Sequence, residues 1–317
     1  MIRRIGDYFE RLADAFGQGW TRFWFTPSDP ATLSAIRLLT GAVVVYLHAT
    51  LSFDLMAFFG PDGLLPVEDI APLEGNAFSY LNYLSTPAEL WTVHLIGLAV
   101  LVLFTLGFAT RVTSVLALIV FLSDVNRAPM ITSLTEPLAA MVMLYLCLAP
   151  CGRRFSVDAL LARRKRADPR HAEVTGQELS TMATIATRLI QIHLALFVAM
   201  MGFSKLSGDV WWIGTGMWWL MARPESRLVD LTGLHATPKL VEAWTHLVVL
   251  FELTFPVLIW APLARPLLLA WGLFTWASIA LVTGDVPFAL MMCVASLAFV
   301  SPAALQGCCR PATAAAA

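Results

Sequence analysis

The sequence predicts an all-α protein: a polytopic bundle of about eight transmembrane helices, preceded by an amphipathic helix and carrying a Trp-rich segment on its outer side. Three observations lead to this prediction. The 317-residue chain is 58% hydrophobic and 14% charged, with a mean hydropathy of +0.72. Its apolar residues gather in runs of about 20, the length that crosses a hydrocarbon core of about 30 Å. Its basic residues gather in alternate connections between these runs, as expected when Lys and Arg stay on the cytoplasmic side.

The first predicted element is an amphipathic helix over residues 1–19. Ile5, Phe9, Leu12 and Phe16 recur at helical spacing, opposite the charged residues. Because no long apolar stretch follows the N-terminal arginines, the segment does not have the pattern of a signal peptide. We expect this helix to lie on the inner face of the membrane.

Eight apolar runs follow and define a membrane domain over residues 20–302, with 303–317 as a flexible cytoplasmic tail. The predicted spans lie near 31–53, 88–109, 112–128, 131–150, 183–204, 239–260, 264–283 and 286–302. Prolines stand at several span boundaries, where they disturb a helix least. A six-span arrangement stays open, in which 112–128 and 131–150 form a re-entrant pair.

The basic residues orient these spans. The stretch between Arg37 and Arg111 has no Lys or Arg but contains six acidic residues, so its connection belongs outside. The connection after 131–150 contains seven basic residues between 153 and 170 and therefore belongs inside. Eight crossings then place both termini in the cytoplasm and Lys205 at the outer end of the fifth span. We expect the protein to reside in a bacterial inner membrane.

Two outer segments are predicted to be more than ordinary loops. Residues 54–87 contain Gly and Pro turns between apolar anchors, so we expect this segment to pack against the bundle. Residues 208–222 contain four tryptophans, a residue type that prefers the membrane interface. We expect a short helix or re-entrant segment there, across the outer mouth beside Lys205.

Ionisable residues within the spans are candidates for function, although pairing for structure is the commoner explanation of any one of them. Arg37 and Arg188 lie near inner ends, where their long side chains can reach lipid phosphate. His48 and His94 have no neighbours in the sequence that suggest a proton relay, and we interpret both as hydrogen-bonded packing residues.

Lys205 and Glu252 are the strongest candidates for chemistry. Lys205 closes an apolar run just before the Trp-rich segment; it is either an interfacial anchor or a shielded amine that can act as a base. Glu252 lies among apolar residues and needs Lys205, Arg188 or a proton as its partner. His193 precedes Lys205 by 12 residues, about 18 Å along a helix, and is therefore interpreted as structural.

Two classes of partner are disfavoured by composition. The net charge of −1 argues against a nucleic-acid partner. The five cysteines form no metal-ligand pattern, so we predict no metal site and interpret the thiols as small buried apolar groups.

A series of short motifs runs in order between residues 20 and 302. They are WTRFWF at 20–25, Arg37, FFGPDGL at 58–64, FSVD at 155–158, GFSKL at 202–206 with the tryptophans and Gly214 after it, and FELTFP at 251–256. Together they resemble the horizontally transferred transmembrane domain family, which includes the membrane core of vitamin K-dependent gamma-carboxylase. The resemblance covers the membrane core of that enzyme and not its large extramembrane domain.

The resemblance implies a quinol-dependent, carboxylase-like enzyme. It implies Lys205 as the base that deprotonates the quinol and Glu252 as a second proton-handling group. The expected cosubstrates are reduced vitamin K or menaquinol, with oxygen and carbon dioxide. Residues expected to bind the cofactor are Trp211, Trp212, Gly214 and Glu136, the last aligned beside a histidine position of the carboxylase.

A different class of function stays open alongside the enzyme. The same fold is expected in a non-catalytic membrane module for maturation of, or immunity to, a secreted peptide, in which Lys205 is an anchor or counter-ion. A transporter is a less favoured hypothesis, because the predicted spans do not include a pair of Gly- or Pro-broken helices at corresponding positions in the two halves of the chain. In every case the lipid bilayer is a partner.

Overall fold

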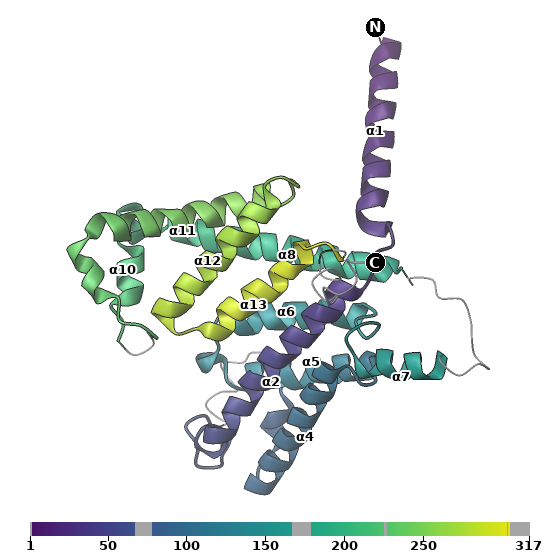
Figure 1. The fold of residues 1–317 in the computed structure, drawn as a ribbon. Coiled ribbons are helices and arrows are strands. Elements are labelled where there is room, and N and C mark those ends of the chain that lie inside the picture. Colours follow the sequence, from purple (N-terminus) through teal and green to yellow (C-terminus); the bar gives the residue numbers. More distant parts are fainter. Residues whose placement is uncertain (1, 67–77, 167–178, 225–226, 303, 305–317) are drawn as a thin grey trace, which may run out of the picture.

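The computed structural model describes residues 2–66, 78–166, 179–224, 227–302 and 304, and within these ranges the chain forms helices and no β-strand (Figure 1). The helices are α1 (Ile2–Phe25), α2 (Ala31–Phe59), α4 (Pro87–Leu106), α5 (Thr110–Arg127), α6 (Thr135–Leu148), α7 (Val157–Arg166), α8 (Thr181–Leu206), α9 (Asp209–Trp212), α10 (Gly216–Met221), α11 (Pro238–Leu258), α12 (Arg265–Thr283) and α13 (Val286–Ser296). Short 3₁₀ helices are η1 (Tyr80–Tyr83), η2 (Pro129–Ile131), η4 (Thr232–Ala236) and η5 (Leu297–Phe299). The predicted all-α class is confirmed.

Five helices, α2, α4, α8, α11 and α12, are long and apolar enough to cross a membrane. Two further apolar segments, α6 and the run from α13 through η5, are shorter. This is the architecture of an integral membrane protein in contact with lipid. The count of eight spans stays a prediction, because it depends on whether α5, α6 and α13 also cross.

Local sequence explains where the helices begin and end, as α4 illustrates. The Thr86 hydroxyl accepts a hydrogen bond from the Glu89 amide, and the Glu89 carboxylate accepts one from the Thr86 amide. Pro87 follows in the first turn, where its missing N–H costs nothing. Gly107 ends the helix at φ 74°, a left-handed conformation that favours glycine.

The long helices pack pairwise around one large apolar core. α2 packs on α4, α8 on α11, and α12 on α13. Phe104 of α4, Ile190 of α8 and Trp276 of α12 are buried members of this core. Gly41 lets α2 approach α4 closely, because a Cβ atom there would lie 2.4 Å from the Thr105 hydroxyl.

A short backbone pairing aligns the starts of α2 and α8. The Ser28 amide donates to the Ser180 carbonyl at 3.3 Å, and the Ser180 amide donates to the Ser28 carbonyl at 3.0 Å. Both helices therefore leave the same end of the bundle (Figure 1). Lys205, in the last turn of α8, lies at the end of that helix farthest from this pairing.

Arg37 corrects one expectation from the sequence. Its side chain is buried, not directed at lipid phosphate. The guanidinium donates to the carbonyls of Phe104 and Thr105 at 2.6 and 2.7 Å, of Cys151 at 3.2 Å and of Phe155 at 2.6 Å. Its charge is offset by carbonyl dipoles from the last turn of α4 and from the connection between α6 and α7, so Arg37 holds these two segments together.

The FSVD motif has a structural role in the same region. The carboxylate of Asp158 accepts hydrogen bonds from the amides of Ala109 and Thr110 at 2.8 and 2.9 Å and from the Thr110 hydroxyl at 2.9 Å. These amides begin α5, whose helix dipole favours a negative charge at this end. Two motifs that carry the family resemblance thus stabilise one corner of the bundle.

Several predicted boundaries differ from the observed ones. The N-terminal helix reaches Phe25, beyond the predicted end at 19, and projects from the bundle with Phe9 and Phe16 exposed (Figure 1). The first long helix continues past 53 through a non-helical residue at Asp54 to Phe59. Of the tail at 303–317, all but residue 304 lies outside the described residues.

The segment 54–87 packs against the bundle as predicted, in the parts that the structure describes. Leu65 and Leu81 are buried in a small apolar cluster with Phe59 and Leu90. Residues 67–77 lie outside the described ranges.

Candidate functional site

Lys205 and Glu252 form an ion pair between the last turn of α8 and the second half of α11. Lys205 Nζ lies 2.7 Å from Glu252 Oε1. The Lys205 side chain is 14% exposed, whereas that of Glu252 is completely buried. Of the three partners that the sequence left open for Glu252, the structure selects Lys205.

Close packing of the two helices makes this pairing possible. Gly202, one turn before the lysine, faces Leu253 and Glu252, and a Cβ atom there would lie 3.1 and 3.2 Å from their side chains. Glu252 Oε2 has no hydrogen-bond partner among the described residues although it is buried. A buried acceptor without a hydrogen bond destabilises a structure, so this oxygen can accept a proton or a hydrogen bond from a bound ligand.

Trp211 covers the lysine from the Trp-rich segment. Lys205 Nζ lies 5.0 Å from the centroid of the Trp211 ring, within cation–π range. The ring rests on Gly216, where a Cβ atom would lie 2.5 Å from it. Two short helices, α9 and α10, lie in this segment, and Trp211 lies beside Lys205. Placement of the segment across an outer mouth stays a prediction.

The other two expected residues of this segment face different partners. The Trp212 ring is 65% exposed, and its N–H donates to the Leu206 carbonyl at 2.7 Å. Gly214 has φ 85° and packs on α11, since a Cβ atom would lie 2.5 Å from Glu242. Both residues thus shape the turn between α8 and α10, and nothing in their contacts marks them as ligand-binding.

Two further polar residues of α8 have local partners. The guanidinium of Arg188 lies 4.3 Å from the Phe23 ring, donates to the Phe23 carbonyl at 3.2 Å and bonds to Gln191 at 2.8 Å. His193 Nδ1 shares a short hydrogen bond with the Tyr145 hydroxyl. The structural interpretation of His193 fits this contact.

A second polar group lies between α2, α4 and α5 and contains the histidines of α2 and α4. His48 and His94 stack with ring centroids 4.2 Å apart. His48 Nδ1 lies 2.6 Å from Asp124 Oδ2, and His94 Nε2 lies 2.7 Å from the Ser52 hydroxyl. Both histidines are buried and hydrogen-bonded, which fits their interpretation as packing residues. Their polar neighbours come from distant parts of the chain and could not be identified from the sequence.

The hydrogen-bond partners of His48 show which of its ring nitrogens carry a hydrogen. His48 Nε2 lies 3.1 Å from the His94 carbonyl, which can only accept, so this nitrogen carries a hydrogen. The remaining contact, between His48 Nδ1 and Asp124, must share one further proton. The pair is therefore either imidazolium with carboxylate or neutral imidazole with carboxylic acid, and it is neutral as a whole in both forms.

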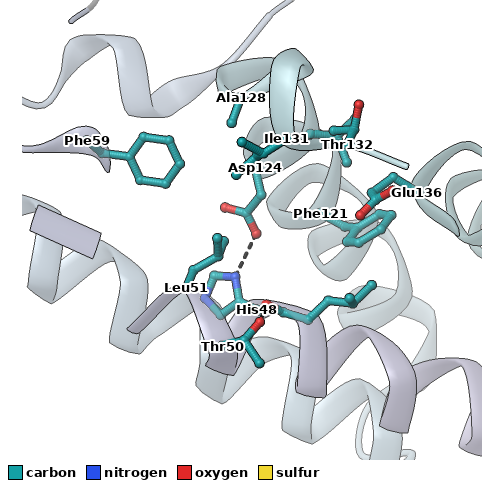
Figure 2. A pocket seen from close by; sticks show the side chains of 12 residues that line it. His48, Thr50, Leu51, Phe59, Phe121, Asp124, Ala128, Ile131, Thr132 and Glu136 are labelled. Atoms are coloured by element: carbon teal, nitrogen blue, oxygen red, sulfur yellow. Dashed lines mark hydrogen bonds and ion pairs between the residues drawn. The ribbon is translucent and has the colours of Figure 1, made fainter. Parts of the chain in front are cut away.

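This pair lines a cavity of about 220 Å³ (Figure 2). Glu136, which the resemblance implies as a cofactor-binding residue, lies here, in a cavity whose lining includes neither Lys205 nor Glu252. Its carboxylate accepts a hydrogen bond from the Ser133 amide at 2.6 Å. The expected site residues thus fall into two groups, with Lys205, Glu252 and Trp211 in one and Glu136 in the other.

Tyr80 stands close to the second group from η1, outside the long apolar helices. Burial raises the pKa of its hydroxyl, and the charge of Asp124 raises it further. This phenol therefore stays protonated at any physiological pH.

Sequence reasoning missed Asp124 and Tyr145. Asp124 lies inside the predicted span 112–128, so an ionisable residue within an apolar run was an available signal. Tyr145 gave no such signal, because a tyrosine in an apolar helix is ordinary. Among the described residues, no three or more His, Cys, Asp or Glu side chains are grouped to hold a metal ion.

Comparisons with protein-family models, with curated proteins and with solved structures find no match for this chain. The chemistry of the two groups therefore has to be argued from their geometry. The first group can move a proton between an amine and a buried carboxyl, and the second holds a shared proton at the wall of a cavity.

Proposed function

We propose that this protein is a quinol-dependent, carboxylase-like membrane enzyme in which Lys205 is the base. The proposal rests on the motif resemblance to the membrane core of vitamin K-dependent gamma-carboxylase. The observation that carries it is the contact between Lys205 and the completely buried Glu252. Ionisable side chains are rare in an apolar bundle and often mark sites of function, which favours a role in proton transfer.

The residues around Lys205 fit a quinol hydroxyl. A base must present a neutral amine, and the Lys205 proton has an acceptor 2.7 Å away in Glu252. Transfer of that proton leaves an uncharged amine beside an uncharged acid, a form that apolar surroundings tolerate well. Glu252 Oε2, buried without a partner, is an acceptor that a bound hydroxyl can use.

Each residue then has a defined task. Reduced vitamin K or menaquinol supplies the acidic hydroxyl and, with oxygen and carbon dioxide, the oxidation and carboxylation chemistry. Lys205 Nζ takes the hydroxyl proton, and Glu252 holds the proton that Lys205 released. Trp211, 5.0 Å from the amine, limits its access to water.

The membrane arrangement is part of the proposal. Eight spans, with α5, α6 and α13 crossing as well, put both termini on the cytoplasmic side of a bacterial inner membrane and Lys205 on the outer side. The exposed Phe9, Phe16 and Trp20 of α1 favour its placement along the inner membrane surface. The Trp-rich α9 and α10 would then lie at the outer interface.

A specific observation favours a second function, that of a non-catalytic module for a secreted peptide. Lys205 already has an ion-pair partner and an aromatic neighbour, which is also how a structural anchor is held. In that case the positive charge alone matters, and Lys205→Arg preserves function.

The two functions are separated by one experiment on the purified protein in lipid nanodiscs. Reduced vitamin K or menaquinol is added with oxygen and bicarbonate, and the quinone epoxide is measured by mass spectrometry. We expect epoxide from the wild type and at least a hundredfold less from both Lys205→Ala and Lys205→Arg, since a guanidinium does not release its proton.

Lys239→Arg is the matched control, because this lysine is 90% exposed on α11. It should retain the activity of the wild type. Absence of epoxide with both quinols, or full activity in Lys205→Arg, would contradict the enzyme.

A further inference from the structure

We propose that the cavity beside His48 and Asp124 binds a small organic ammonium ion with an apolar body. This site is separate from the Lys205 group and does not depend on the proposed enzyme. Its volume of about 220 Å³ is smaller than the roughly 300–1,000 Å³ of pockets for drug-sized ligands and therefore suits a smaller molecule. The chemical class follows from three properties of the walls: hydrogen-bonding character, charge and shape.

The polar groups of the lining leave only acceptors for a ligand. The hydroxyl of Thr50 donates to the Leu47 carbonyl at 2.7 Å, and that of Thr132 donates to the Pro129 carbonyl at 2.9 Å. Both ring nitrogens of His48 are engaged, with Asp124 and with the His94 carbonyl. A ligand that only accepts hydrogen bonds would find no donor side chain among these groups.

Two carboxylate oxygens stay open to the cavity. Oδ2 of Asp124 bonds to His48 and Oε2 of Glu136 bonds to the Ser133 amide. Oδ1 of Asp124 and Oε1 of Glu136 have no hydrogen-bond partner among the described residues. Asp124 and Glu136 both belong to the lining of the same cavity (Figure 2), so each offers an acceptor to an N–H-rich ligand.

The charge of the lining favours a cation. The pair of His48 and Asp124 is neutral as a whole, so Glu136 leaves one negative charge. Arg127 does not line the cavity; its guanidinium lies 5.4 Å from the Phe59 ring and donates to the Leu65 carbonyl. A monovalent ammonium ion therefore meets both the charge and the donor requirement.

The remaining walls are apolar. Leu51, Phe121 and Ile131 belong to the lining, and Phe121 lies beside Glu136 (Figure 2). A fully hydrated inorganic ion would leave these walls in contact with water. An aromatic or branched alkyl amine instead covers them while its ammonium group contacts the acceptors.

Benzylamine and benzyl alcohol test this assignment, because they share a shape and differ in charge. Each is titrated calorimetrically into the protein in lipid nanodiscs, and the heat from empty nanodiscs is subtracted. We expect saturable binding of benzylamine, at least tenfold tighter than that of benzyl alcohol. Glu136→Gln should weaken benzylamine binding about tenfold and leave binding of the alcohol unchanged.

Glu10→Gln, the same substitution on exposed α1, is the matched control and should bind as the wild type does. Asp124→Asn also removes the partner of His48, so Glu136→Gln is the deciding variant, and its thermal unfolding is checked against the wild type. Equal affinity for amine and alcohol, no saturable binding of benzylamine, or unchanged amine binding in Glu136→Gln would overturn the proposal.

Discussion

Replacing Arg37 by methionine removes all the donors of a buried guanidinium while keeping an unbranched apolar chain in place of the arginine's aliphatic part. In the native structure this group donates to four carbonyls, those of Phe104, Thr105, Cys151 and Phe155. The Phe104 carbonyl also accepts from the Gly107 amide at 3.1 Å. The substitution therefore leaves three carbonyls without the donor that the structure provides.

The expected loss of stability follows from those three acceptors. An unpaired buried acceptor costs about 1–3 kcal/mol, so three of them set a range of about 3–9 kcal/mol. Two effects reduce this figure: the last turn of α4 and the connection between α6 and α7 can relax, and the variant no longer buries the charge of Arg37. We expect Arg37→Met to lower the free energy of unfolding by about 3–5 kcal/mol.

The measurement is unfolding of the purified protein in mixed micelles of mild detergent and SDS, followed by far-ultraviolet circular dichroism. Arg37→Lys should recover less than half of the loss, because an ammonium cannot reach the carbonyls of both segments that the guanidinium joins. Arg11→Met, on the exposed side of α1, should unfold as the wild type does. Wild-type stability in Arg37→Met, or full recovery in Arg37→Lys, would refute the reasoning and favour the lipid-phosphate role expected from the sequence.

Two further predictions concern packing between helices. Lys205→Met should lower the free energy of unfolding by about 3–5 kcal/mol, because it leaves a fully buried carboxylate without its partner, and Glu252→Gln should lower it by about 1–2 kcal/mol. In the same unfolding assay, the double variant should lose less stability than the sum of the two single losses. Additive losses would contradict the ion pair. Gly41→Ala should lower the free energy of unfolding by about 1–3 kcal/mol, since the new Cβ atom would lie 2.4 Å from the Thr105 hydroxyl. Gly17→Ala, whose Cβ atom would have no neighbour within 4 Å, should leave the stability of the protein unchanged. Equal stability of the two alanine variants would contradict the close approach of α2 and α4.

The sequence alone predicted the helices well because their signals are local. Apolar runs and prolines at boundaries act within about 20 residues of chain. The same is true of Lys205 beside Trp211, which are six positions apart. These features could be read without knowing how the helices pack.

Contacts between distant segments had no such signal. The sequence predicted that Arg37 binds lipid phosphate, because it shows only that this residue lies near a helix end. The carbonyls that surround Arg37 come from residues 67 to 118 positions away along the chain. The pairing of His48 with Asp124 spans 76 positions. For Glu252 the sequence could only name candidates, of which Lys205 proved to be the partner.

Hydropathy and charge therefore determined that this chain is a helical membrane protein, because the transfer of each helix from water to lipid depends on its own residues. Only the tertiary structure decided which polar groups share a proton or a cavity. That choice depends on distances of about 3 Å between side chains from different helices, which are set by how the helices pack and not by the residues next to each group.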